Sequence, residues 1–187
     1  MDVLDKLTAE QRTLVVSLPY RAGLWVSESD DLGGDEAHEK ELTALSNIVQ
    51  GFSEQVFGSE LLQYIMDETV KRKDHWHRSW ANDIEKVPEQ CEQALNVLRD
   101  HVDDKEVNAY SVRLMEIAEA VALAFREYEQ QSTGDKLRVY FSYIVAKIKS
   151  RFSKIPAKTF DQFLNISLSE RRALSTMARA LGTHYSI

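Results

Sequence analysis

The residue types in this sequence that could do chemistry are concentrated in one acidic turn, residues 29–41. Carboxylates and two adjacent glycines crowd together there, between two apolar helical patterns. Calcium and magnesium take several oxygen ligands, and acids on a loop and on the next helical turn can converge on one such ion. The turn therefore predicts a divalent-cation site, for calcium or magnesium, with the candidate ligands Asp30, Asp31, Asp35, Glu36 and Glu39.

The same turn has a simpler interpretation, which stays open. Acids in the first turn of a helix stabilise its positive end without any bound ion. The turn is not an EF-hand, because placing Gly34 at the turn glycine of that loop puts Lys40 at the twelfth position, where a bidentate acid is required. A bound phosphate is excluded because five carboxylates would repel it.

Histidine and cysteine offer no second candidate site. His75 and His77 are two residues apart, so on a helix they point to different faces and cannot hold one ion. We interpret them as part of an exposed polar stretch above two packed tryptophans. Cys91 lies on an apolar stripe, which is typical of a core residue. We therefore assign no catalytic and no cofactor-binding residues.

Composition and charge narrow the class of protein. The 187 residues include one cysteine, so no intramolecular disulfide can form, as in proteins of reducing compartments. The amino terminus lacks the basic start and apolar run of a secretory signal. Apolar runs are far shorter than the roughly 20 residues that span a bilayer. We expect a cytoplasmic protein without a membrane span.

The net charge of −7 is unevenly distributed along the chain. Residues 136–187 contain ten Lys and Arg against two acids, a charge of +8 that leaves −15 on the remainder. We expect this segment to pack beside the acidic body, although it could instead face an anionic partner. Its aromatic residues fall on an expected core stripe and are not free to stack on bases. Specific binding of DNA or RNA is therefore not expected.

The elements that position these residues are expected to be helices. Apolar residues recur at spacings of three and four, and no run alternates with period two. The pattern predicts an all-α fold, a single-domain bundle of about seven helices over residues 1–187, with 107–128 as the central helix. The expected helices span residues 8–27, 35–56, 60–87, 89–98, 107–128, 137–148 and 167–181.

Several helix boundaries carry local signals. Thr8 and Glu10 indicate a capping box, and Pro19 predicts a kink or a restart near Ser17. Pro88 predicts the end of the third helix. Gly182 is expected to close the last helix as a left-handed cap.

Two segments carry a resemblance to a known family. Residues 18–26, LPYRAGLWV, lead into acids and glycine and then an acidic helix start; residues 117–124, IAEAVALA, lead into an acidic polar link and another helix. Over residues 12–150 this plan resembles the TerB-like, or tellurite-resistance-like, domains. The resemblance implies an all-helical fold, a link to bacterial stress responses, and a metal ion held by acids in both turns.

The sequence also departs from that family pattern. Leu32 separates Asp31 from Gly33 and lengthens the first turn, and residues 126–129 read REYE where aspartate and glycine are typical of the family. Residues 157–187 have no counterpart in the family. We expect them to form a helical extension that packs on the 12–150 core.

The resemblance implies a non-enzymatic bacterial stress-response or signalling module that binds a divalent cation through the acidic turn. Such a module would act with a protein partner or as a homo-oligomer. The alternative is a metal-dependent helical hydrolase or lyase in which the same acids hold a metal-activated water. An enzyme should place a histidine, a lysine or another acid across from the turn, and the sequence names no such residue.

Overall fold

The chain is helical wherever its structure is described, which in this computed structural model is residues 3–29, 35–55, 58–128 and 168–183. Over these ranges there are seven α-helices, two short 3-10 helices and no strand, which confirms the all-α fold class. The α-helices are α1 (Val3–Lys6), α2 (Ala9–Ser27), α3 (Asp35–Ser53), α4 (Glu60–Lys71), α5 (Val87–Arg99), α6 (Asp104–Tyr128) and α8 (Leu168–Ala180). The 3-10 helices are η1 (Lys73–His75) and η2 (Ile84–Lys86).

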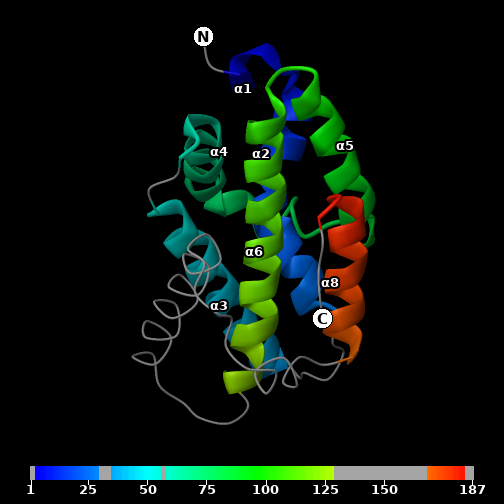
Figure 1. Cartoon of the computed structure of the whole chain (residues 1–187). Helices are drawn as coiled ribbons and strands as arrows, with labels where there is room; N and C mark the ends of the chain where they lie inside the picture. Colours follow the sequence, from blue (N-terminus) through cyan, green and yellow to red (C-terminus); the bar gives the residue numbers. More distant parts are fainter. Residues whose placement is uncertain (1–2, 30–34, 56–57, 129–167, 184–187) are drawn as a thin grey trace.

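Two long helices, α2 and α6, form the centre of the bundle. They pack against each other, and each also contacts α3, α4, α5 and α8. Figure 1 shows α6 running along the front with α2 behind it, α3 and α4 on one side, and α5 and α8 on the other. The expected central helix is therefore one member of a central pair.

Helix α2 is enclosed around its whole circumference, because every residue from Val15 to Leu24 is buried. It runs without a break from Ala9 to Ser27, so the restart predicted near Ser17 does not occur. Pro19 has no amide hydrogen, and the carbonyl of Val15 consequently lacks its helical donor. The Tyr110 hydroxyl of α6 donates to that carbonyl at 2.8 Å. A tertiary contact thus replaces the missing helical hydrogen bond.

Two other boundary predictions were wrong in detail. The partner of Thr8 in the capping box is Gln11 rather than Glu10, since the Gln11 side chain accepts from the Thr8 amide at 3.0 Å. Pro88 does not end a long third helix. Helix α4 ends at Lys71, and Pro88 lies in the first turn of α5, where its missing amide hydrogen costs nothing.

The last described helix closes as expected. Gly182 has a left-handed backbone, with φ of 62°, and the Thr183 amide donates to the Ala178 carbonyl at 2.9 Å. The Ser111 hydroxyl of α6 donates to the Leu181 carbonyl at 2.9 Å, so α8 is tied to the central pair. The expected helix 137–148 and most of the +8 segment lie outside the described residues.

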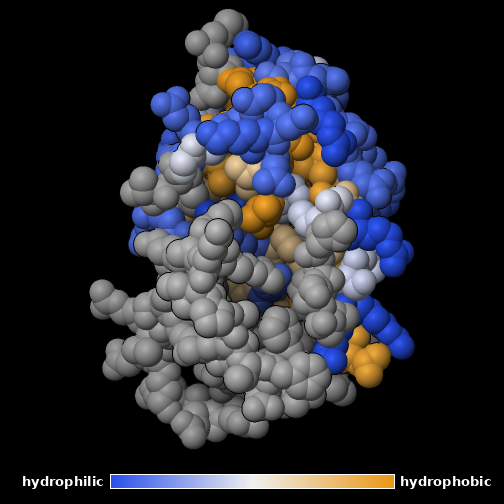
Figure 2. Space-filling model, viewed as in Figure 1, coloured by the Kyte–Doolittle hydropathy of each residue, from blue (hydrophilic) through white to orange (hydrophobic). Residues whose placement is uncertain are grey.

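Hydrophilic residues cover most of the described surface on the face seen in Figure 2, and apolar residues show between them. Among the described residues, Leu168 at the start of α8 is a large apolar residue that is 69% exposed. None of the described helices is long and apolar enough to cross a membrane.

Candidate functional site

The acidic turn joins the C-terminal end of α2 to the N-terminal end of α3. Asp30 and Asp31 lie outside the described residues, as do the side chains of Asp35 and Glu36, although the backbone of both opens α3. Glu39 is exposed on the same helix. The structure therefore places three of the five candidate ligands on one helix and leaves the convergence of all five untested.

Hydrogen bonds secure the α2 end of the turn. The Ser29 hydroxyl donates to the Val26 carbonyl at 2.7 Å. The Ser27 hydroxyl donates to the carboxylate of Glu41 at 3.2 Å, which links the last turn of α2 to α3. Helix carbonyl ends carry partial negative charge and helix amide ends carry partial positive charge. The turn thus begins where a cation is favoured and ends where carboxylates are favoured.

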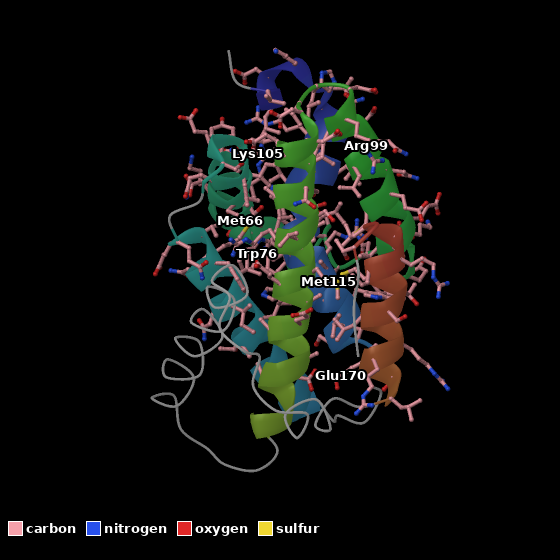
Figure 3. The ribbon with its side chains drawn as sticks, viewed as in Figure 1. Met66, Trp76, Arg99, Lys105, Met115 and Glu170 are labelled. Carbon is pink, nitrogen blue, oxygen red and sulfur yellow. The ribbon has the colours of Figure 1, made fainter. Side chains whose placement is uncertain are left out.

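The two histidines lie where the sequence predicted, above buried tryptophans. His75 and His77 are exposed, whereas Trp76 and Trp80 are 1% and 5% exposed. The Trp76 ring stacks on Tyr20 of α2 with 4.7 Å between ring centres. Figure 3 shows Trp76 at mid-height of the bundle. These tryptophans anchor the connection between α4 and α5, residues 72–86.

Two hydrogen bonds add to that anchoring. The Trp76 indole donates to the Thr69 carbonyl at 3.1 Å. The Tyr20 hydroxyl lies 3.2 Å from Nδ1 of His77. Burial, followed by the nearby charge of Glu28, raises the pKa of Tyr20 well above its ordinary value, so the phenol stays neutral. The exposed His77 therefore hydrogen-bonds to the buried Tyr20–Trp76 pair through the Tyr20 hydroxyl.

Arg21 holds the second half of the same connection. Arg21 is 7% exposed, and its Nη2 donates to the carbonyls of Asn82 at 2.8 Å and Asp83 at 3.0 Å. Asp83 has a left-handed backbone with φ of 51°, a conformation that costs roughly 1 kcal/mol in an ordinary residue. Burial lowers the pKa of Arg21, and the charge of Asp83 opposes that shift. An arginine within the apolar stripe of α2 gave no sequence signal for this contact.

A buried ion pair lies on α6 beside α3. Arg113 Nη1 is 3.3 Å from Glu116 Oε2 and donates to Gln55 at 3.3 Å. The guanidinium carbon lies 4.8 Å from the ring centre of Phe52. Burial lowers the pKa of Arg113, and the charge of Glu116 opposes the shift. These contacts fix α6 against α3 and make Arg113 structural. The i,i+3 spacing could have predicted the pair with Glu116, but the contacts with Phe52 and Gln55 require the fold.

Three cations surround Glu68 on α4, whose side chain is 13% exposed. Arg12 of α2 lies 3.1 Å from Oε2, Arg72 lies 3.2 Å from the same atom, and Lys71 lies 3.3 Å from Oε1. Burial by itself would raise the pKa of Glu68, but hydrogen bonds and charges from Lys71 and Arg72 outweigh it and hold the pKa below its ordinary value. The i,i+3 and i,i+4 spacing could have predicted two of these pairs; the Arg12 contact requires the fold.

Cys91 is a core residue, as predicted, and has no exposed surface. Burial raises the pKa of its thiol to about 12. Because the thiolate is the reactive form of cysteine, Cys91 is not a nucleophile at neutral pH.

Comparisons with protein-family models, with curated proteins and with solved structures find no match to this chain.

Proposed function

We propose that this protein is a non-enzymatic stress-response or signalling module of the TerB-like kind, which binds calcium or magnesium in the turn between α2 and α3. The resemblance of residues 12–150 to TerB-like domains supplies the biological class. The carboxylates of the acidic turn supply oxygen ligands for the ion. A protein partner, or a second copy of the chain, would respond to the bound ion.

The observation that carries the proposal is the register of the acids on α3. The helix begins at Asp35, so Asp35 and Glu36 are four and three residues from Glu39. Residues at these spacings are neighbours on one helical face. Carboxylates gathered on one face repel one another, and a divalent cation relieves that repulsion while taking their oxygens as ligands. Three acids on the first turns of α3 therefore favour a cation at this end of the helix.

The chemistry of the described core supports a role without catalysis. The reactive side chains buried there are held in their unreactive forms, because burial raises the pKa of both Cys91 and Tyr110 above their ordinary values. Within the described residues, no three His, Cys, Asp or Glu side chains are grouped to hold a metal. The hydrolase or lyase alternative would use the same acids of the turn, so the unreactive core side chains, and not the metal ligands, separate the two functions.

Calorimetric titration with calcium, magnesium, manganese and zinc tests the proposal. We expect at least one ion to bind with Kd below about 1 mM and to raise the melting temperature, because a ligand that binds only the folded state stabilises it. The Asp35→Asn, Glu39→Gln variant should lose both effects.

The matched control is Glu89→Gln with Glu92→Gln, which removes two exposed acids from one face of α5. That variant should bind metal as the original chain does. Absence of any binding tighter than millimolar, together with a melting temperature that metal does not change, would contradict the cation site. Equal losses in the two variants would show a general effect of net charge instead.

A further inference from the structure

A basic and largely exposed segment begins at Lys71, the last residue of α4. We call residues 71–78 the basic loop. Its exposed side chains are Lys71, Lys73, Asp74, His75, His77 and Arg78. Only one of them is acidic, whereas the chain outside residues 136–187 carries −15. The basic loop is therefore a local reversal of charge on an acidic body.

Glu68, on the last turns of α4 just before the basic loop, is already neutralised. Glu68 is contacted by Arg12 and by Arg72, in addition to Lys71. Two arginines and one lysine around one carboxylate leave an excess of positive charge. The side chain of Lys71 is 66% exposed, so this excess faces solvent.

The basic loop is held rigidly for a segment with little regular structure. Trp76 is buried on Tyr20, and Nζ of Lys73 lies 5.8 Å from the Trp76 ring centre while donating to Gln50 at 2.6 Å. Arg21 fixes the following turn through the Asn82 and Asp83 carbonyls. The whole connection between α4 and α5, residues 72–86, is long for a segment without long helices or strands. Connections of that length are commonly binding loops. Fixed cations also lose little side-chain entropy when a partner binds.

We propose that the basic loop is a docking surface for a carboxylate-rich segment of a partner protein. Lys71, Lys73 and Arg78 are all exposed within these eight residues, and we expect a short acidic segment to contact them. Exposed ammonium and guanidinium groups complement such a segment and would speed its association. The surface lies apart from the acidic turn, so it does not depend on the proposed cation site.

Nucleic acid is a poorer match to the basic loop. Binding of single strands relies on aromatic rings that are free to stack on bases. The ring of Trp76 is covered by Tyr20, and Trp80 is 5% exposed. A long polyanion would also meet the negative potential of the surrounding body.

Fluorescence anisotropy with a fluorescein-labelled decaglutamate peptide tests the proposal at low ionic strength, where charge interactions are least screened. The Lys73→Glu, Arg78→Glu variant should bind the peptide about tenfold more weakly or worse, because like charges are then opposed. Lys73→Gln with Arg78→Gln should show a smaller loss and provides a second variant if charge reversal disturbs folding. Circular dichroism checks the fold of each.

The control places the same change of charge elsewhere. Arg99 and Lys105 are exposed at the turn between α5 and α6, at the upper end of the molecule in Figure 3. Arg99→Glu with Lys105→Glu should leave peptide affinity within about twofold. Equal losses in both charge-reversal pairs, failure of the original chain to bind the peptide, or tighter binding of a single-stranded oligodeoxythymidine would each overturn the proposal.

Discussion

The Val15 carbonyl shows how one residue makes another necessary. Pro19 removes the amide that would hydrogen-bond to it, and the site is buried, so no water replaces the donor. Tyr110 supplies the hydroxyl from the other central helix. Pro19 is thus tolerated inside α2 because Tyr110, which is distant in sequence, supplies the missing hydrogen-bond donor.

We predict that Tyr110→Phe lowers the free energy of unfolding by about 1 to 3 kcal/mol, the cost of a buried acceptor left without a donor. In a Pro19→Ala background the restored amide can serve Val15, so the same substitution should cost less. Denaturant unfolding of the original chain, Tyr110→Phe, Pro19→Ala and the double variant measures this coupling. Tyr64→Phe, at a half-buried position where the hydroxyl accepts only a long 3.5 Å hydrogen bond from Arg12, should change stability by under about 0.5 kcal/mol. Equal costs in both backgrounds would show that the hydroxyl does not replace the missing bond.

Glu68 gives a prediction for pH. Its pKa in the folded protein lies below the ordinary value of 4.5, so its contribution to stability is present above about pH 4.5 and is lost as pH falls through the lower folded value. Glu68→Gln should therefore cost about 1 kcal/mol at pH 7, and the difference from the original chain should shrink toward pH 3.

Urea unfolding between pH 3 and 7 checks the Glu68 prediction. Glu92→Gln, an exposed acid on α5, is the control and should change stability little at pH 7. A cost of Glu68→Gln that stays constant over this pH range would mean that packing of the side chain, not its charge, stabilises the fold.

At the scale of the helix, Gly23 lets α2 approach its neighbours closely. A Cβ at this position would overlap Cδ1 of Leu45 on α3 and lie 3.1 Å from Cγ2 of Val121 on α6. Leu45 and Val121 are both buried, so neither can move away freely. A residue without a side chain is therefore required where three helices meet.

We predict that Gly23→Ala destabilises the protein by about 1 to 2 kcal/mol. Overpacking of a core costs about 1 to 3 kcal/mol, and the better helix propensity of alanine returns up to about 1 kcal/mol. Adding Leu45→Val, which removes the overlapping atom, should recover part of the loss in a thermal unfolding assay. Gly58→Ala has open space around it and should be close to neutral. A stabilised Gly23→Ala protein would show that the helices can separate at no cost.

The helices themselves were predictable where one face is apolar, as in α5 and α6. The prediction failed at the connection between α4 and α5, where residues 72–86 were expected to be largely helical. That segment is organised by Trp76 and Arg21, whose partners are distant in sequence. Local periodicity contains no information about such contacts. The same limit applies to the acidic turn, whose residue types were evident while its geometry depends on how α2 meets α3.

At the scale of the whole molecule, the sequence predicted an all-α bundle but only one of its two central helices. The apolar stripe of α6 is regular and easily found. Helix α2 is buried on all sides, so its pattern has no polar face to mark a direction. Pro19 and Arg21 also make the sequence of α2 look unlike that of a buried helix, because proline and arginine are uncommon there. Enclosure by five other helices, rather than amphipathicity, defines its place.

The enclosure of α2 has a consequence for synthesis of the protein. Helix α2 is complete at Ser27, whereas α6, which covers it, ends at Tyr128. At translation rates of about 5 to 20 residues per second, roughly 5 to 20 s separate the emergence of the two helices. During that interval the most apolar helix of the described chain has no central partner. We therefore expect the nascent chain to bind ribosome-associated chaperones during this interval, and slower translation to lengthen that exposure.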